Sequence, residues 1–229
     1  MSLADRLLEA QQRIAAAASE AKRSLDEINL IVVTKNHPAE LVLDLLDLGV
    51  RDFGENRDQE AGPKSAEVRS RSELAHNWHF IGQLQSNKVK SVVTYAASIH
   101  SLDRKSLLES LAKATLDRVK PLDVFVQLNL TDDPGRGGIQ PSDLLAFAEQ
   151  VLDQPGLKLV GVMGVAALDH NLARDFGAIQ AASEKLQALS PDANQISAGM
   201  SEDFETAIAY GATHVRVGSQ ILGPRTYGA

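Results

Sequence analysis

The sequence contains no cysteine, which excludes a disulfide framework and a thiolate metal site. It has no apolar run near the roughly 20 residues that a membrane-spanning helix needs. The N-terminal stretch MSLADRLLEAQQRI is charged and has helical spacing, unlike the apolar core of a secretory signal. We therefore expect a cytoplasmic globular protein without a membrane partner.

Basic charge is also scarce, since 23 Lys and Arg residues are outnumbered by 30 Asp and Glu residues and the net charge is −7. The sequence has no long basic run and no stripe of basic and aromatic residues, so we expect no nucleic-acid partner. The 6 histidines are scattered singly without the spacing of metal ligands, so we predict no metal site.

What the chain does have is a regular alternation of strand and helix patterns. Its 229 residues are 44% hydrophobic, enough for a full core, and we expect one domain over residues 1–229. Apolar runs predict strands at 28–35, 50–56, 77–82, 98–102, 122–129, 157–165, 195–198 and 213–218. Helical spacing predicts helices at 3–24, 38–48, 57–71, 86–92, 104–118, 141–152, 171–189 and 201–210. We expect Gly62-Pro63 to interrupt the third helix.

Repeated strand–helix units imply a parallel sheet, and about eight units in this length most simply close into a single (β/α)8 TIM-type barrel of the α/β class. An N-terminal helix, within about residues 1–26, precedes the barrel. A doubly wound open sheet is the structural alternative. It is disfavoured because no glycine-rich phosphate fingerprint follows the first strand.

Lys35 lies at the carboxyl end of the first predicted strand, whose residues 30–33 are apolar on both faces. Parallel α/β folds place their ligands at that end of the strands. A lysine beside apolar walls loses its proton more easily, and a neutral amine can form a Schiff base with an aldehyde. The alternative is that Lys35 merely leaves the core and reaches water.

Two loops resemble the phosphate sites of barrels, which often follow the seventh and eighth strands. They are AGMS at 198–201 and GSQILG at 218–223. Exposed backbone N–H groups at such turns favour an anion, and Ser197, Ser201 and Ser219 could add hydroxyl donors. The alternative is ordinary helix capping by Ser201, in which Glu202 and Asp203 complement the helix dipole.

The last strand pattern places Arg216 inside the barrel. Period-two alternation puts His214 and Arg216 on one face, while Val215 and Val217 suit the helix layer on the other. A buried guanidinium needs an acceptor. A heteroaromatic ring nitrogen, a phosphate or a buried carboxylate such as Glu55 would serve.

Seven stretches along the chain together resemble one known family. They are VTKNHP (33–38), FGENRDQE (53–60), NWHFIGQLQSNK (77–88), VQLNLTDDPGRGG (126–138), GVMGV (161–165), SAGMSEDFETAI (197–208) and GATHVRVGSQILGPR (211–225). In this order and spacing they are similar to the pyridoxal phosphate homeostasis protein family, and the likeness runs from the first strand to the C-terminus.

The resemblance implies a fold-type III pyridoxal phosphate protein, similar to the alanine racemase N-terminal barrel. It implies an internal aldimine, a Schiff base of the cofactor, on Lys35. It places the phosphate on Ser197, Ser201, Gly218 and Ser219, and the ring nitrogen on Arg216. The full cofactor-binding set that we expect is Lys35, Asn56, His79, Ser197, Met200, Ser201, Arg216, Gly218 and Ser219. His79 taken by itself fits a hydrogen-bonded histidine of the barrel interior better than a ligand.

Four positions depart from the family pattern. Arg57 stands where many members have tyrosine, Asp58 where an apolar residue is usual, and His37 and Arg136 where many have lysine. None belongs to the core cofactor set. The departures weigh against regulatory or cofactor-transfer roles that depend on those lysines.

The residues favour a cofactor carrier over an enzyme. A racemase needs acid/base groups on both faces of the substrate carbon, and Lys35 supplies only one. Tyr95, Tyr210 and Tyr227 lie in no recognisable catalytic motif, and we expect no second domain to supply another. An arginine at the ring nitrogen also discourages its protonation, which weakens the cofactor as an electron sink.

We therefore predict a monomeric protein that binds pyridoxal phosphate and serves intracellular cofactor and amino-acid homeostasis without strong turnover. Pyridoxal-phosphate-dependent enzymes are its expected recipients. The first alternative is an amino-acid racemase or a related fold-type III pyridoxal phosphate enzyme. A Schiff-base aldolase for a phosphorylated sugar ranks last, because that class rarely carries its lysine on the first strand.

Overall fold

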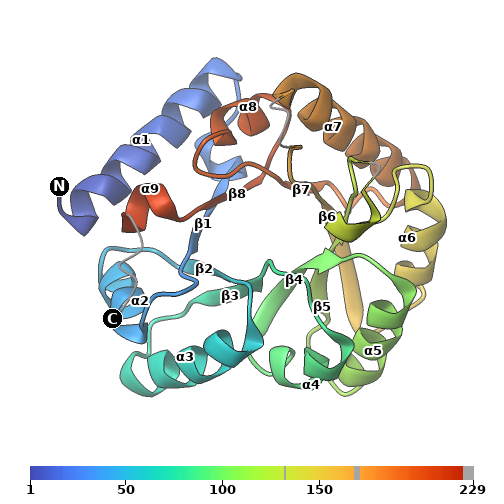
Figure 1. Ribbon diagram of the computed structural model, residues 1–229, viewed down its shortest axis with the longest axis horizontal. Coiled ribbons are helices and arrows are strands. Elements are labelled where there is room, and N and C mark those ends of the chain that lie inside the picture. Colours follow the sequence, from blue (N-terminus) through green and yellow to red (C-terminus); the bar gives the residue numbers. More distant parts are fainter. Residues whose placement is uncertain (132, 168–170, 224–229) are drawn as a thin grey trace.

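The computed structural model describes residues 1–131, 133–167 and 171–223. Within them, parallel strands β1 to β8 close into a barrel in chain order, with β1 paired to β8, and helices cover the outside (Figure 1). The strands are β1 (Asn29–Val33), β2 (Asp52–Glu55), β3 (Asn77–Phe80), β4 (Ala96–Leu102), β5 (Leu122–Gln127), β6 (Leu157–Met163), β7 (Gln195–Ser197) and β8 (His214–Val217). The predicted TIM-type barrel is confirmed, and the open-sheet alternative is wrong.

The helices follow the strands in alternation. The α-helices are α1 (Leu3–Glu20), α2 (Ala39–Asp47), α3 (Asp58–Arg71), α4 (Val89–Val92), α5 (Lys105–Thr115), α6 (Leu144–Leu152), α7 (Leu172–Leu189), α8 (Phe204–Ala209) and α9 (Ser219–Leu222). Short 3-10 turns stand at η1 (Leu25–Glu27), η2 (Ser86–Lys88) and η3 (Pro134–Arg136). None of the described helices is both long enough and apolar enough to cross a membrane.

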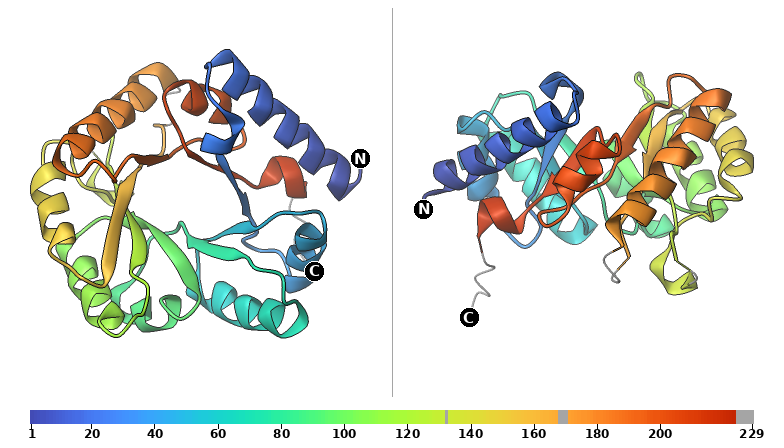
Figure 2. Two further views of the ribbon diagram at one scale, coloured as in Figure 1. Left: turned by 180° about the vertical axis from the view of Figure 1, so that it is seen from behind. Right: turned by 90° about the horizontal axis from the view of Figure 1, so that it is seen from above.

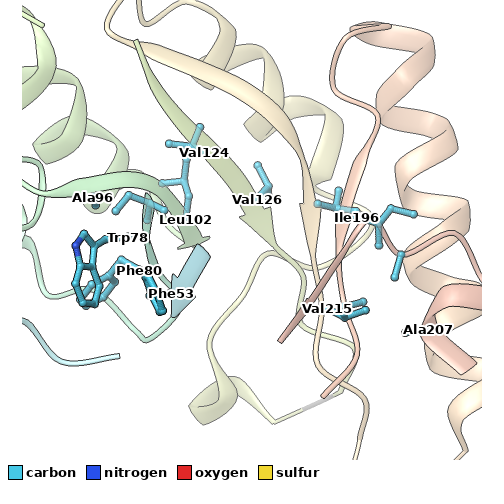
Figure 3. Packing of buried hydrophobic residues seen from close by; sticks show 14 of the residues in the cluster. Phe53, Trp78, Phe80, Ala96, Leu102, Val124, Val126, Ile196, Ala207 and Val215 are labelled. Carbon is cyan, nitrogen blue, oxygen red and sulfur yellow. The ribbon is translucent and has the colours of Figure 1, made fainter. Parts of the chain in front are cut away.

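The main apolar core lies between the strands and the helices. Outward-facing strand residues such as Phe53, Trp78 and Val215 pack there (Figure 3). Each of the three is at most 3% exposed. Full burial of side chains of this size contributes about 1.5–3 kcal/mol each before entropy is counted. Alternation along each strand therefore sends apolar side chains outward and leaves the barrel interior to the other set.

Helix α1 packs beside α8 and α9, next to the seam between β8 and β1 (Figure 2). Ser2 begins the helix with a capping box that it shares with Asp5. The Arg6 Nε–H donates to the carbonyl oxygen of Ile221 at 2.6 Å, which ties α1 to α9. The N-terminal helix thus supports the loop that carries Ser219.

Helix α3 runs without a break through Gly62-Pro63, so the predicted interruption is wrong. A residue before proline is normally pushed out of the helical region by clashes that involve its Cβ, and glycine has none. The Ser65 hydroxyl also donates to the Gly62 carbonyl at 2.8 Å, and Lys64 anchors the same turn to the barrel. Tertiary contacts therefore hold a helix that the local signal argued against.

Candidate functional site

Lys35 lies just past the carboxyl end of β1, in a turn held from two sides. The His37 N–H donates to the Thr34 carbonyl at 3.1 Å, and Asn36 between them has a left-handed φ of 63°. The Asn36 N–H in turn donates to Oε2 of Glu60 on α3 at 3.0 Å. Such conformations are uncommon for residues other than glycine and persist where the surroundings define them, so the backbone that presents Lys35 is well fixed.

A buried ion pair underlies this turn. The Thr34 hydroxyl donates to Oε1 of Glu55 at 2.7 Å, and Lys64 Nζ donates to the same oxygen at 2.6 Å and to the Thr34 carbonyl at 2.9 Å. Burial raises the pKa of Glu55, and Lys64 opposes that shift. Glu55 is therefore the partner of Lys64, and the alternative that it accepts from Arg216 is not realised.

A pocket of 350 Å³ opens at the mouth of the barrel beside β1 and β8. Its volume lies in the range of about 300–1,000 Å³ that small-molecule and cofactor sites occupy. Six of the nine expected cofactor residues line it: Lys35, Met200, Ser201, Arg216, Gly218 and Ser219. The structure thus brings the amine, the two serine loops and the arginine to one place.

The two serine hydroxyls meet at the Gly218 backbone. The Gly218 N–H donates to Ser201 Oγ at 3.4 Å, and Ser219 Oγ lies 3.2 Å from the same oxygen. Helix α8 begins only at Phe204, with Asp203 at the capping position. Ser201 therefore caps no helix, and the capping interpretation of this loop is wrong. Two hydroxyls and the Gly218 N–H converge here instead, and such donors favour a phosphate.

Arg216 is buried in the barrel, as the strand alternation predicted, and is 5% exposed. Its Nη1 donates to Ser197 Oγ at 2.7 Å and its Nη2 to the Gly164 carbonyl at 3.0 Å. It forms no ion pair with a carboxylate in the part of the chain that the structure describes. Burial lowers the pKa of the Arg216 guanidinium to about 10 and the charge of Asp203 opposes that shift, so the guanidinium stays charged at neutral pH. Both protein acceptors are neutral, and three N–H groups remain.

The other three expected residues do not line this pocket. Asn56 lines a separate 520 Å³ pocket with Arg57 and Gln83. Ser197 and His79 point into the barrel interior and are 0% and 6% exposed.

Sequence reasoning missed several residues that the fold brings to the site. His37, Glu202 and Asp203 line the pocket with Lys35, and Ile81 forms part of its apolar wall. His37 was considered only as a departure from the family pattern, although it lies two positions after the lysine. The acidic pair was interpreted only as a complement to a helix dipole.

Two of the three tyrosines fall within the described residues, and neither lines the pocket. The Tyr95 hydroxyl donates to Oδ1 of Asp58 at 3.2 Å, and burial raises the pKa of this tyrosine. Tyr210 packs, partly buried, against the apolar core. Tyr227 lies outside the described residues. No cluster of three or more metal-ligating side chains occurs among the described residues either.

The donor set of the pocket fits pyridoxal phosphate group by group. Lys35 offers an amine for the aldehyde, and Ser201, Gly218 and Ser219 offer donors for the phosphate. Arg216 offers guanidinium N–H groups, without a carboxylate partner, for a ring nitrogen. The three kinds of group come from different parts of the chain, and the fold brings them to one pocket.

Comparisons with known proteins point to the same cofactor. Residues 10–226 match the family described as alanine racemase, N-terminal domain. The pyridoxal phosphate homeostasis protein of Pseudomonas aeruginosa is 37% identical over 100% of this chain and 98% of its own. The protein of that name from Escherichia coli K12 is 36% identical, with 98% and 97% covered.

Solved structures give the same result. PipY of Synechococcus elongatus, with PLP bound, superimposes with a TM-score of 0.82 at 33% identity, covering 97% of this chain and 100% of PipY. The alanine racemase of Corynebacterium glutamicum gives a TM-score of 0.70 at 12% identity, covering 99% of this chain and 64% of the racemase, which shows a shared fold alone. On its fold and its full-length relatives, the chain belongs to the pyridoxal phosphate homeostasis protein family.

Proposed function

We propose that this protein binds pyridoxal phosphate in the pocket at the barrel mouth and holds it as a Schiff base on Lys35. The observation that carries the proposal is one pocket in which a lysine, two serine hydroxyls and a buried arginine without a carboxylate partner converge. When bound, the cofactor supplies an electron sink for amino-acid carbanions. Formation of the Schiff base joins the Lys35 nitrogen to the aldehyde carbon and releases one water molecule.

The residues of the chain have distinct tasks in this proposal. The turn around Asn36 and the ion pair beneath it hold the Lys35 backbone in place. Ser201, Ser219 and the Gly218 backbone hold the phosphate, and Met200 borders it. Arg216 donates to the ring nitrogen and keeps it unprotonated, because the guanidinium remains charged.

We further propose that the protein serves cofactor and amino-acid homeostasis with little turnover of its own, as a cytoplasmic, single-domain monomer. The proposal draws on the names of its relatives and on the proposed contact of Arg216 with the ring nitrogen, which would make the cofactor a weak electron sink. Recipients would be pyridoxal-phosphate-dependent enzymes. Sedimentation at increasing concentration tests the monomer, and a tight dimer at all concentrations would contradict it.

One observation favours the second candidate, an amino-acid racemase or a related fold-type III enzyme. His37, Glu202 and Asp203 line the pocket and are titratable groups that could act opposite Lys35. Proton exchange at the α-carbon of alanine in deuterated buffer separates the two functions. Stereoinversion near the enzyme median of about 10 per second would establish the racemase, whereas slow exchange that disappears in Lys35→Ala fits the carrier.

The binding proposal is tested by trapping. Purified protein loaded with pyridoxal phosphate and reduced with borohydride should carry one cofactor adduct, located on Lys35 by peptide mass spectrometry. Lys35→Ala should abolish the adduct and the yellow colour, whereas Lys90→Ala, an exposed control on α4, should keep both. An adduct on another lysine of the unsubstituted protein would refute the assignment.

A further inference from the structure

A continuous row of polar side chains crosses the barrel interior, starting from Arg216 at the mouth. Ser197 Oγ, which accepts from Arg216 Nη1, lies 2.8 Å from Nδ1 of His100. His100 Nε2 lies 2.9 Å from Ser98 Oγ, and Ser98 Oγ lies 2.7 Å from Nδ1 of His79. Each of these five residues is at least nine-tenths buried. Of the five, Arg216 alone lines the pocket at the barrel mouth.

The row ends at the opposite end of the barrel. His79 Nε2 lies 2.8 Å from Oδ1 of Asp52, the first residue of β2. Asn77 Nδ2 donates to the same oxygen at 3.0 Å. Burial would raise the pKa of Asp52, but the hydrogen bonds from His79 and Asn77 outweigh burial and lower the pKa. The row therefore joins a guanidinium at the mouth to a carboxylate at the base.

When both imidazole rings are neutral, every group in the row has a partner only if the hydrogen bonds all donate in the direction from Arg216 to Asp52. A guanidinium can only donate, so Ser197 accepts from Arg216 and its O–H is left for His100 Nδ1. His100 then carries its proton on Nε2 and donates to Ser98, whose O–H donates to His79 Nδ1. His79 Nε2–H finally donates to Asp52, which as a carboxylate can only accept.

The surroundings keep His100 neutral, as this direction requires. His100 stacks on Phe125 with ring centroids 4.2 Å apart, and His214 of β8 lies 6.1 Å away. Burial lowers the pKa of His100 well below its usual value and the pKa of His214 to about 4.

We propose that His100, His79 and Asp52 are positioning residues for the Arg216 guanidinium, and that Asp52 is a second, remote counter-charge through this row of aligned hydrogen bonds. A buried cation with no carboxylate in hydrogen-bond contact is costly to hold, and the charge of Asp203 offsets only part of the effect of burial on Arg216. Hydrogen bonds that point the same way polarise one another and stabilise the charges at both ends. The row also fixes the rotation of the guanidinium plane, which sets the direction of the N–H groups that face the pocket.

The first test measures the protonation of the row's histidines in the cofactor-free protein, so it does not depend on the proposed function. Nitrogen–proton correlation spectra of the histidine rings at pH 8 should show His100 and His79 neutral, each with its proton on Nε2. The Arg216 side-chain resonances should shift in Asp52→Asn and stay unchanged in Asp26→Asn. Asp26 lines the same pocket as Asp52, at the base of the barrel, so this control also removes one negative charge there. A proton on Nδ1 of His100, or unchanged Arg216 resonances in Asp52→Asn, would overturn the proposal.

The second test rests on the proposed function and measures binding of pyridoxal phosphate by absorbance titration. Asp52→Asn should raise the dissociation constant about three- to tenfold and shift the absorbance of the bound cofactor, as remote coupling of this kind does. Ser98→Ala should have a smaller effect, because His100 Nε2 lies 3.1 Å from His79 Nδ1 and can donate there directly. Equal affinities and spectra in Asp52→Asn and Asp26→Asn would refute the coupling.

A third variant separates the loss of the hydrogen bonds from the loss of core packing. His100→Phe keeps the stack on Phe125 but removes both links, so we expect a larger loss of affinity than in Asp52→Asn. If it fails to fold, the near-surface Asp52→Asn still decides the question. If the unsubstituted protein binds no pyridoxal phosphate, the proposed function is wrong. The first test still decides whether Asp52 is coupled to Arg216, because it uses the cofactor-free protein.

Discussion

Gly218 has little room for a side chain, because a Cβ atom there would lie 3.1 Å from the Val33 carbonyl oxygen and 3.3 Å from Val33 Cβ. Val33 ends β1, two residues before Lys35. Gly218→Val should therefore push the phosphate loop away from the lysine and weaken pyridoxal phosphate binding at least tenfold in an absorbance titration. Gly177→Ala is the matched control, since only Tyr210 Cε1 lies near it, at 3.6 Å. Equal binding by both variants would contradict the prediction.

The ion pair between Lys64 and Glu55 should contribute to stability, because both side chains are buried. Lys64→Met should lower the free energy of unfolding by about 3–5 kcal/mol, since it leaves a buried carboxylate without its cation. Urea unfolding measures the loss. Glu55→Gln in the same chain should restore a large part of it, and a double variant no more stable than Lys64→Met would show that the pair is not the cause.

At the scale of elements, helix α3 contains Pro63 in its interior, where proline normally destabilises a helix. Pro63 is exposed, so replacing it sacrifices no core packing, while an alanine N–H can donate to the Gln59 carbonyl one turn earlier. Pro63→Ala should raise the free energy of unfolding by about 1–3 kcal/mol in a urea titration. A loss of stability would mean that the proline is needed to shape the turn that holds Lys64.

Element boundaries followed the sequence less closely than element types did. Strand β4 begins at Ala96, before the predicted 98, and the predicted helix at 86–92 divides into η2 and α4. Predicted helix 201–210 shortens to α8, because residues 200–203 form the serine loop instead. Ends of elements depend on which side chains the rest of the fold engages, so local patterns locate them only loosely.

For the whole molecule, the neutral histidines inside the barrel make stability depend on pH. The folded protein holds His100 and His214 at lowered pKa values, whereas the unfolded chain protonates them near 6.5. The unfolded state therefore binds more protons as the pH falls, and stability is fully present above about pH 6.5 and is lost toward pH 4.

We expect the free energy of unfolding to fall by up to about 1.4 kcal/mol per pH unit for each of these two histidines in that window. Urea unfolding at a series of pH values measures the slope. His214→Gln should reduce the slope by about half. An unchanged slope in this variant would rule out His214 as a source of the pH dependence.

The sequence by itself determined the barrel, the position of Lys35 and the inward direction of Arg216. These follow from periods of 2 and 3.6 residues, which are set within a few residues of backbone. The likeness of its seven stretches to one family also located the pocket residues Ser201, Gly218 and Ser219.

Only the tertiary structure decided which groups those residues meet. Ser201 turns to the Gly218 N–H, Glu55 pairs with Lys64, and Asp52 connects through His79 and His100 to the arginine. These contacts join residues far apart in the chain, such as His100 and Ser197, and they depend on how the strands are staggered when the barrel closes. No local pattern contains that register, so the polar interior of the barrel could not be predicted from the sequence.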